Sequence, residues 1–427
     1  MIELRRIDPV ATLRGTLRVP GDKSSSHRAL MISALADGAS EIIGLSPGLD
    51  VAATSRIVEQ LGAVRYDHDT GVTVVGPADG LRACDEVLSC ANSGTTMRLL
   101  SGILSAVPGE HVLTGDQSLS RRPMDRVAEP LTLMGSRVVG QGPRITAPLR
   151  IFGTKSLHGI DYRVPSASAQ VKSAILLSGL SASGASVVHE SVRTRTTTED
   201  MLVHAGVAVS RTDHDAGRSV TLQPSRPVSS QWRIPGDPSQ AAFFAVLGVV
   251  HPDAIIEVLE IDTAPERVGF VGVLERMGAD VALVGAGGGT SLVARSSELR
   301  ATEIHSREIP SVDEVPILTV AAAAATGVTA FREMGELRVK ESDRFASSMQ
   351  LASILGCRVW SEGDDFFVKG LGSARAFEEL AFDVQLDHRM VMACSVAALA
   401  GVGGLINGAS TVSSSYPNFF DDLAALR

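Results

Sequence analysis

The first stretch of the chain that could do chemistry combines several groups that bind anions. Residues 19–28 read V-P-G-D-K-S-S-S-H-R and run into the apolar segment 29–36. After the Pro-Gly turn, Asp22 or Ser24 can cap a helix by accepting a hydrogen bond from a free backbone N–H group. Free N–H groups, the positive end of the helix dipole, hydroxyls and cations together suit a phosphate or a carboxylate. Two pairs are four residues apart and therefore share a helix face: Lys23 with His27, and Ser24 with Arg28. The simpler alternative is a well-capped surface helix whose basic side chains are solvated.

A second stretch, residues 336–344, concentrates charge as E-L-R-V-K-E-S-D-R. If it is helical, Lys340, Glu341 and Arg344 share one face, with two cations flanking a carboxylate. A carboxylate in such surroundings can serve in proton transfer. The alternative is a self-neutralising surface helix, which is the usual meaning of such a charge run.

Two shorter segments place arginine beside a proline or at a helix start. They are the loop 120–125, S-R-R-P-M-D, and the tripeptide D-H-R at 387–389. The loop has a bland alternative, an exposed basic loop, and a lone histidine such as His388 is usually structural. With isolated carboxylates such as Asp313, however, this set suits a cleft for two small anionic substrates, because arginine and lysine neutralise phosphate and carboxylate groups.

Helices and strands must bring these segments together, and the length sets the scale. A chain of 427 residues predicts two domains or more. Hydrophobic residues make up 44%, aromatic residues 4% and charged residues 20%, and the 41 glycines favour tight packing of helices on sheets. The net charge of −9 argues against a nucleic-acid partner, which demands an excess of lysine and arginine.

Other classes of site are not indicated. The sequence has no metal-ligand spacing, no Walker motif and no G-x-S-x-G elbow, and the glycines at 285–289 fit a hairpin turn. The apolar stretches 315–330 and 390–406 are interrupted by Thr, Ser and Gly, so we expect buried helices and no membrane span. No signal-peptide pattern opens the sequence, and a cytoplasmic location is expected. The scattered cysteines are expected to be reduced and mostly buried: Cys84, Cys90, Cys357 and Cys394.

The pattern of a turn followed by an apolar helix recurs six times. Its turn residues follow one another at intervals of 71, 74, 70, 74 and 77: Gly21, Asn92, Ser166, Gly236, Pro310 and Asp387. Such self-similarity predicts repeated α/β units, three in each of two halves. The echo between 19–24 and 234–239 suggests that the chain crosses between the halves at these two places. If the halves face each other, six positive helix ends converge on one cleft.

With these segments in view, the chain closely resembles the 5-enolpyruvylshikimate-3-phosphate synthase family from about residue 12 to the C-terminus. Six motifs carry the resemblance: P-G-D-K-S-x-S-H-R at 20–28, N-S-G-T-T-M-R at 92–98, R-R-P-M at 121–124, S-A-Q-V-K-S-A at 168–174, R-V-K-E-S-D-R at 338–344 and D-H-R at 387–389. Because all six occur in order, the resemblance is highly specific.

The resemblance implies an α/β (α+β) fold of two similar domains, each with three βαβαββ-type units, and an active site in the interdomain cleft. Residues 21–236 would form an inserted domain on the shikimate-phosphate side. Residues 1–20 and 237–427 would form the domain for phosphoenolpyruvate and proton transfer. The implied reaction transfers the enolpyruvyl group of phosphoenolpyruvate to the 5-hydroxyl of shikimate 3-phosphate and releases phosphate. It needs no metal and no organic cofactor, and a monomer is expected.

The resemblance also implies roles for individual residues. Phosphoenolpyruvate would be held by Lys23, Arg122, Arg344 and Arg389, with Gly94 letting it approach the backbone. Shikimate 3-phosphate would be held by Ser24, Arg28, Ser168, Gln170 and Arg195, and Asn92 also belongs to the implied binding residues. Asp313 would be the base at the 5-hydroxyl, Glu341 the proton carrier at C3, and Lys340 and His388 would support that charge change.

Four positions depart from patterns seen in the family. Ser414 stands where part of the family has a lysine, Glu336 where some members have Asn, and Ala169 where some have Ser. The segment around Arg195 reads T-R-T-T-T-E instead of S-R-D-H-T-E. The cation that Ser414 replaces is therefore either absent or supplied elsewhere.

Three other functions were weighed. The sister enzyme that acts on UDP-N-acetylglucosamine has Lys-Asn where this chain has Lys23-Ser24, and a reactive cysteine in the loop where this chain has none at 115–121. A non-catalytic anion-binding protein on the same fold is a second possibility, since fold does not imply function. A nucleic-acid-processing relative would be expected to bind ATP and to carry a basic surface.

Overall fold

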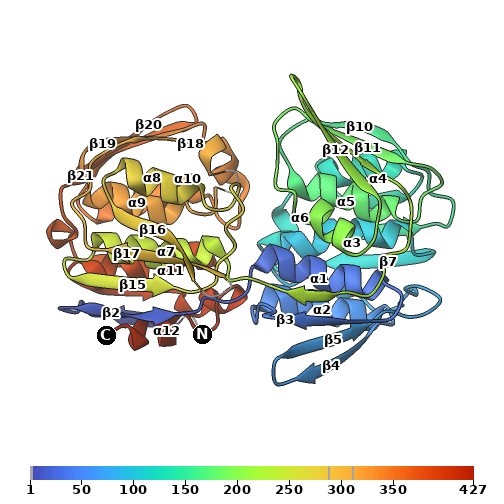
Figure 1. Cartoon of the computed structure of the whole chain (residues 1–427). Helices are drawn as coiled ribbons and strands as arrows, with labels where there is room; N and C mark the ends of the chain where they lie inside the picture. Colours follow the sequence, from blue (N-terminus) through green and yellow to red (C-terminus); the bar gives the residue numbers. More distant parts are fainter. Residues whose placement is uncertain (1–2, 287–288, 310–311) are drawn as a thin grey trace. The chain divides into compact units, whose positions relative to one another are not determined.

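The computed structural model describes residues 3–286, 289–309 and 312–427. The chain forms two compact units: unit 1 comprises Met1–Asp22 and Pro235–Arg427, and unit 2 comprises Lys23–Ile234. Unit 2 is thus inserted into unit 1 (Figure 1). The domain limits inferred from the sequence, 21–236, differ from those of unit 2 by two residues at each end.

Within the described residues, each unit contains three sheets built on one plan. Two parallel strands are joined by a helix, and a second helix leads into an antiparallel hairpin that completes the sheet. In the third repeat, for example, the strand order is β10-β11-β13-β12. The last sheet has three strands, in the order β1-β23-β22. The predicted α/β fold with repeated βαβαββ-type units is confirmed.

Unit 2 holds the first three repeats. The first consists of β14 (Gln231–Arg233), α1 (Lys23–Leu35), β3 (Ala39–Ile43), α2 (Leu49–Gln60), β4 (Val64–His68) and β5 (Gly71–Val75). The second consists of β6 (Leu88–Ser89), α3 (Gly94–Ser105), β7 (Gly109–Thr114), η1 (Leu119–Arg121), α4 (Asp125–Leu133), β8 (Arg137–Gln141) and β9 (Thr146–Gly153). The third consists of β10 (Asp161–Val164), α5 (Ala169–Gly179), β11 (Ser186–Glu190), α6 (Thr197–His204), β12 (Val209–His214) and β13 (Gly217–Leu222).

Unit 1 holds the other three. The fourth consists of β2 (Leu13–Leu17), α7 (Pro238–Val250), β15 (Ala254–Val258), α8 (Gly269–Arg276), β16 (Asp280–Ala286) and β17 (Gly289–Arg295). The fifth consists of β18 (Glu303–His305), η2 (Ser306–Glu308), α9 (Val315–Ala324), β19 (Thr326–Arg332), η3 (Gly335–Val339), α10 (Arg344–Ile354), β20 (Arg358–Glu362) and β21 (Asp365–Leu371). The sixth consists of η4 (Ala374–Ala376), β22 (Leu380–Asp383), α11 (His388–Ala400), β23 (Gly404–Asn407), η5 (Ala409–Ser414), α12 (Phe419–Ala425) and β1 (Leu4–Ile7).

The first and fourth repeats exchange their first strands. β2 precedes α1 in the chain but pairs in parallel with β15 of unit 1, whereas β14 precedes α7 but pairs in parallel with β3 of unit 2. Beside these crossings, Gly21 and Gly236 form an antiparallel bridge, and the Asp22 N–H donates to the Pro235 carbonyl at 2.7 Å. The two segments that echo each other in sequence are therefore paired at Gly21 and Gly236.

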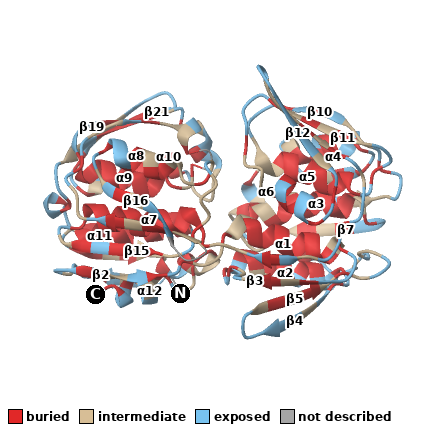
Figure 2. Cartoon of the chain, viewed as in Figure 1, coloured by how far each residue is buried: buried red, intermediate tan, exposed pale blue. Residues whose placement is uncertain are grey.

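Each unit has its own hydrophobic core. In unit 1, α7, α9 and α11 pack against one another, and all of their residues are buried. A helix buried on every side must be apolar all round, which explains sequences such as V-P-I-L-T-V-A-A-A-A in α9. In unit 2, α3 packs on α5, and α1 packs on α2, α3 and α6. In Figure 2, α9 of unit 1 and α1 of unit 2 are coloured mostly as buried.

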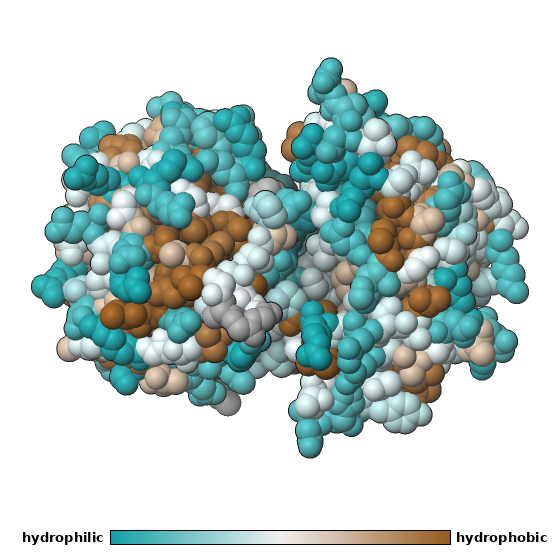
Figure 3. All heavy atoms as spheres, viewed as in Figure 1, coloured by the Kyte–Doolittle hydropathy of each residue, from teal (hydrophilic) through white to brown (hydrophobic). Residues whose placement is uncertain are grey.

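The surface view adds one feature of unit 1. Figure 3 shows apolar side chains gathered on the viewed face of unit 1. The edge strand β16 contributes exposed apolar residues, with Leu283 36% and Val284 45% exposed. These side chains lie outside the core of unit 1.

Two long apolar stretches were wrongly expected to be helices throughout. In 315–330 the helix ends at Ala324 and β19 begins at Thr326; in 390–406 the helix ends at Ala400 and β23 begins at Gly404. In both cases glycine and β-branched residues follow the alanine-rich part, and these residues favour turns and strands.

Smaller expectations had mixed outcomes. The glycine-rich hairpin predicted at 285–289 is formed by β16 and β17. A second hairpin, of β4 and β5, follows the alternation of apolar and polar residues on both sides of its turn. The turn residues 287–288, and the turn residue Pro310 of the fifth repeat, lie outside the described residues.

Candidate active site

Helix α1 of unit 2 places Lys23 and Arg28 in a buried polar network. Lys23 Nζ lies 3.1 Å from Asp50 Oδ2. Arg28 is 3% exposed and donates to Ser24 Oγ at 2.7 Å and to Thr198 Oγ1 at 2.6 Å. The predicted pairing of Ser24 with Arg28 is thus present, and the alternative of a solvated basic surface is wrong for these residues.

The start of α3 brings together Asn92, Gly94 and Arg122. Arg122 is 7% exposed, and its Nη2 donates to Asn92 Oδ1 at 3.2 Å. A Cβ atom added at Gly94 would lie 3.0 Å from Arg122 Nη1 and 3.1 Å from Arg98 Nη1. The two arginines of the loop therefore differ: Arg121 is exposed, as the alternative of a basic surface loop predicts, whereas Arg122 is buried beside the start of α3.

The start of α5 presents Ser168 and Gln170. Ser168 caps the helix by accepting from the Val171 N–H at 3.4 Å. The Gln170 amide is fixed from both sides, because its oxygen accepts from Arg98 at 2.6 Å and its nitrogen donates to Thr95 at 3.0 Å. These side chains are therefore held in place before any ligand binds.

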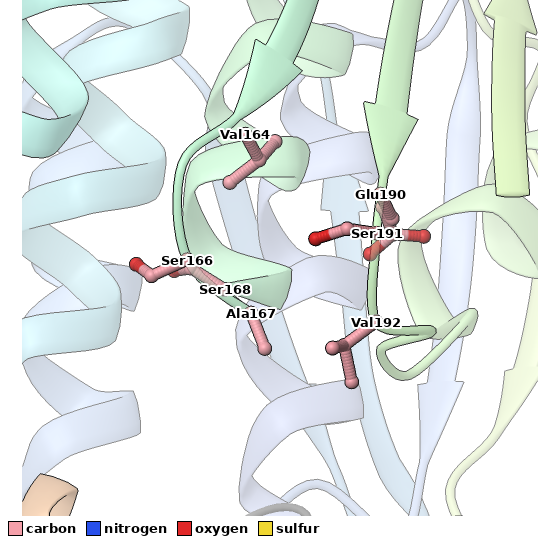
Figure 4. A pocket seen from close by; sticks show the side chains of 7 residues that line it. All are labelled: Val164, Ser166, Ala167, Ser168, Glu190, Ser191 and Val192. Atoms are coloured by element: carbon pink, nitrogen blue, oxygen red, sulfur yellow. The ribbon is translucent and has the colours of Figure 1, made fainter. Parts of the chain in front are cut away.

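Arg195 lies in the connection between β11 and α6 and is partly buried. Near this connection, a small pocket is lined by Val164, Ser166, Ala167, Ser168, Glu190, Ser191 and Val192 (Figure 4). The pocket thus joins the start of α5, where Ser168 lies, to the end of β11.

In unit 1, Arg344 is the hub of the charged groups. It is 1% exposed and contacts three carboxylates: Asp313 at 2.7 Å, Glu341 at 2.6 Å and Asp387 at 2.8 Å. Burial alone would lower the pKa of the Arg344 guanidinium, but Asp387, Glu341 and Asp313 outweigh burial and raise it. The arginine therefore stays charged.

Asp313 also belongs to this cluster. Its side chain is 27% exposed, and Arg389 Nη2 lies 3.9 Å from its Oδ2. Burial favours the protonated form, but Arg389, Arg344 and Lys340 dominate and hold the pKa of Asp313 well below its usual range. The preceding residue, Val312, has a positive φ of 51°, which is rare for a β-branched residue. A strained backbone at Val312 therefore helps to fix the position of Asp313.

Helix α11 supplies His388 and Arg389, which are 3% and 2% exposed. Asp387 caps the helix by accepting from the Arg389 N–H at 2.9 Å. Arg389 Nη1 donates to the Ser239 carbonyl at 3.0 Å. Both basic residues are thus built into the start of the helix instead of being solvated.

The segment 336–344 is not one continuous helix. η3 ends at Val339 and α10 begins at Arg344, so Lys340 and Glu341 lie in the turn between them. Lys340 Nζ contacts Glu336 at 2.8 Å. Because the buried Arg344 holds Glu341, the alternative of a solvated, self-neutralising helix is wrong for this pair.

Sequence reasoning missed three residues of these networks. They are Asp50, which contacts Lys23; Arg98, which orients Gln170; and Asp387, which was named only as a turn residue. Asp387 had a usable signal, since an Asp directly before a helix start is a typical N-cap. Asp50 had none, because only the fold brings it to Lys23. Arg98 ends the motif at 92–98, but its contact with Gln170 could not be predicted from the sequence.

Two further findings concern the described residues alone. Over 3–286, 289–309 and 312–427, no group of three or more His, Cys, Asp and Glu side chains is arranged to hold a metal ion. Within the same ranges, no helix has both the length and the apolar character that crossing a membrane requires. The four cysteines form no disulfide; Cys84 is partly exposed, and Cys90, Cys357 and Cys394 are buried.

Comparison with known proteins first concerns the fold. The fold resembles that of the enolpyruvyl transferase NikO from Streptomyces tendae, with a TM-score of 0.77 over 99% of this chain and 97% of that one. At 19% identity this likeness concerns the fold alone.

Closer matches define the family. The family model described as EPSP synthase (3-phosphoshikimate 1-carboxyvinyltransferase) matches residues 7–423. The chain is 38% identical to a 3-phosphoshikimate 1-carboxyvinyltransferase from Herpetosiphon aurantiacus, covering 97% of both chains. It is 42% identical to one from Halorhodospira halophila, covering 99% of this chain and 95% of that one. An EPSP synthase structure from Acinetobacter baumannii matches with a TM-score of 0.85 and 36% identity over 100% of this chain and 98% of that one. The chain belongs to the EPSP synthase family.

Proposed function

We propose that this protein is an enzyme that transfers the enolpyruvyl group of phosphoenolpyruvate to the 5-hydroxyl of shikimate 3-phosphate and releases phosphate. Family membership supports the reaction. The observation that carries the proposal within this chain is the hub of unit 1, where one buried arginine, Arg344, contacts both Asp313 and Glu341. The reaction needs two groups that carry protons, and Asp313 and Glu341 are two carboxylates that contact the same arginine.

In the addition step, the 5-oxygen of shikimate 3-phosphate bonds to C2 of phosphoenolpyruvate. We assign Asp313 to accept the proton of the 5-hydroxyl and Glu341 to deliver a proton to C3. The product is a tetrahedral intermediate that still carries the phosphate of phosphoenolpyruvate at C2.

In the elimination step, Glu341 takes a proton back from C3, and the C2–C3 double bond forms again. The bond between C2 and the phosphate oxygen breaks, and phosphate leaves with the electron pair. We assign Lys340 and His388 to support the change of charge at Glu341. Preplaced charges favour such a step because they do not have to reorganise during the reaction.

The low pKa of Asp313 in the free protein is consistent with this role once the substrates are considered. Arg389, Arg344 and Lys340 lower that pKa, and the first two are the cations assigned to phosphoenolpyruvate. A bound anion offsets their charge, so the pKa of Asp313 rises and the carboxylate becomes a stronger base. Asp313 is then activated by the arrival of the substrate.

The remaining assigned residues bind the two anions. We assign Lys23, Arg122, Arg344 and Arg389 to phosphoenolpyruvate, and Ser24, Arg28, Ser168, Gln170 and Arg195 to shikimate 3-phosphate. Asn92, which accepts from Arg122, orients that arginine. Holding two reactants in a fixed geometry is itself a large part of catalysis.

We also propose that the protein acts as a monomer in the cytoplasm. Light scattering coupled to size-exclusion chromatography tests the monomer, and a mass of twice 44.7 kDa would contradict it. Fractionation of cells of the source organism, with immunodetection of this chain, tests the location.

The proposed activity is tested by phosphate release from the purified protein with phosphoenolpyruvate, in the presence of a chelator. Shikimate 3-phosphate is the acceptor, and UDP-N-acetylglucosamine is the comparison acceptor. We expect release with shikimate 3-phosphate alone. Release only with the nucleotide sugar would indicate the sister reaction, and no release with either acceptor would indicate a binding protein.

A further inference from the structure

A buried ion cluster in the third repeat of unit 2 has no part in the assignments above. It consists of Lys172 on α5, Glu190 at the end of β11 and Glu199 on α6. Lys172 Nζ lies 2.9 Å from Glu190 Oε2 and 2.6 Å from Glu199 Oε1. The three side chains are at most 2% exposed. Buried charges add little to stability compared with apolar groups of equal size, so such a cluster calls for another explanation.

The positions of the two carboxylates suggest one. β11 ends at Glu190, and α6 begins at Thr197, two residues before Glu199. A single ammonium group therefore binds both ends of the connection 191–196. Because the connection leaves one partner of Lys172 and returns to the other, its ends cannot separate without exposing a buried charge.

The middle of the connection is attached to the same cluster. The Thr194 hydroxyl donates to Glu190 Oε1, and Thr194 is 7% exposed. Thr194 directly precedes Arg195, to which we assign a contact with shikimate 3-phosphate. The connection is thus fixed at three points, and the third lies beside the assigned residue.

Lys172 also relates the connection to the other assigned residues. It lies in the first turns of α5, the helix that Ser168 caps. In Figure 4, Ser168 and Glu190 line the same small pocket. The neighbours of the cluster residues, Ser173 and Thr198, bind each other at 2.6 Å and both accept from Arg28. The cluster therefore continues into the network of Ser24 and Arg28.

We propose that Lys172, Glu190 and Glu199 position the connection 191–196 so that Arg195 and Ser168 together bind the phosphate group of shikimate 3-phosphate. They are positioning residues, because they act through Thr194 and the backbone. The inference rests on the proposed function. Its physical basis is preorganisation: a loop already held in its binding conformation loses less conformational entropy when the ligand binds.

The sharpest test uses two threonines on the two sides of Arg195. Thr194→Val removes the hydroxyl that donates to Glu190 and keeps the shape of the side chain. Thr196→Val is the matched control, since its hydroxyl donates to the exposed Asp200 at 2.6 Å. We expect Thr194→Val to raise the KM for shikimate 3-phosphate about tenfold, to leave the KM for phosphoenolpyruvate unchanged and to change kcat less than about twofold. The control should match the wild type.

A second series addresses the charge. Lys172→Met should raise the same KM by more than Thr194→Val does, and Lys172→Arg should recover most of the affinity. Thermal melts identify a variant that fails to fold, in which case Thr194→Val carries the test. Calorimetry with shikimate, which lacks the phosphate, should give equal affinity for the wild type and Thr194→Val.

The outcomes separate this inference from the proposed function. If wild-type protein neither binds nor converts shikimate 3-phosphate, both are wrong. If Arg195→Ala raises the KM for shikimate 3-phosphate but Thr194→Val does not, only the positioning role is wrong. If Thr194→Val lost affinity equally for shikimate and for shikimate 3-phosphate, the positioning role would also be wrong. The substitution would then not act through the phosphate group.

Discussion

Helices α3 and α5 of unit 2 begin differently from α7, α10 and α11 of unit 1. In unit 2, serine hydroxyls cap these two helices: Ser93 accepts from the Thr96 N–H of α3 at 3.1 Å, and Ser168 caps α5. In unit 1, carboxylates do so: Asp237 caps α7, Asp343 caps α10 and Asp387 caps α11. Both kinds of cap satisfy the backbone, but only a carboxylate also supplies a negative charge.

This difference separates two kinds of chemistry. A hydroxyl leaves the positive end of the helix dipole uncompensated, so an external anion can take that place. A carboxylate compensates the helix end internally and attracts arginines, as Asp387 does with Arg344 and Asp237 does with Arg267. We infer that unit 2 is built mainly for binding anions, and unit 1 for holding carboxylates and arginines in fixed states of charge.

The largest expected effect tests the proton-transfer role of unit 1. Asp313→Asn removes the assigned base with little change of shape, so turnover should fall by about 10²- to 10⁴-fold. Binding of shikimate 3-phosphate, measured by calorimetry, should stay within a few fold of the wild type. Unchanged turnover would show that Asp313 is not the base, and the contrast between the units would then lose its main support.

The next effect compares the caps directly. Asp387→Asn keeps an acceptor for the Arg389 N–H but removes the negative charge that faces the buried Arg344. Because a buried charge then loses one of its partners, the free energy of unfolding should fall by about 3 kcal/mol. Ser93→Ala removes an uncharged cap and should cost about 1 kcal/mol. Urea unfolding of both variants measures the difference. Equal losses would mean that the charge of the cap has no special importance.

A third prediction concerns the crowded start of α3. Glyphosate is the herbicide directed at this family, and this chain keeps Gly94 where an alanine could replace it. We therefore expect glyphosate to inhibit by competing with phosphoenolpyruvate. Gly94→Ala should raise the KM for phosphoenolpyruvate several-fold, since the added Cβ lies only 3.0 Å from Arg122 Nη1 and must displace it. Steady-state kinetics measure both effects. Full activity in excess glyphosate would contradict the first, and an unchanged KM the second.

The smallest expected effect concerns the dependence of stability on pH, and it should occur in both units. Burial lowers the pKa of His111 in unit 2 and of His251 in unit 1, and backbone hydrogen bonds offset this only in part. Since the unfolded pKa is about 6.5, the stability from each neutral ring is complete above that pH and is lost as the pH falls toward the folded pKa. His111→Gln and His251→Gln should each flatten the loss of unfolding free energy between pH 7 and 5. An unchanged slope in both variants would contradict this account.

The sequence predicted features that depend on nearby residues. The pairing of Ser24 with Arg28 follows from a spacing of four on one helix, and the hairpin of β4 and β5 follows from alternation on both sides of a turn. The six repeats were visible as intervals between turn residues. In these cases the distance along the chain fixes the distance in space.

Features that depend on distant residues were missed or mistaken. The echo between 19–24 and 234–239 correctly predicted where the chain crosses between the units. The exchange of β2 and β14 itself leaves no local signal, because each strand pairs with a partner more than 180 residues away. Arg344 holds Glu341 in the turn between η3 and α10, and its other partners, Asp313 and Asp387, come from distant segments, so this cluster could not be predicted from the spacing within 336–344. The left-handed backbone at Val312 is likewise set by its surroundings, since valine does not favour it.

The location of the two chain ends has a consequence for biosynthesis. β1 pairs with β23, and β2 pairs with β15, so both ends of the chain belong to unit 1. On the ribosome, unit 2 emerges as one continuous segment and can fold while synthesis continues, as domains generally do. Strand β1 must wait for nearly four hundred further residues before β23 appears, and partners so distant in sequence are slow to meet. Strand β1 thus stays unpaired until β23 has been synthesised, and chaperones that bind exposed strands can bind it during that time.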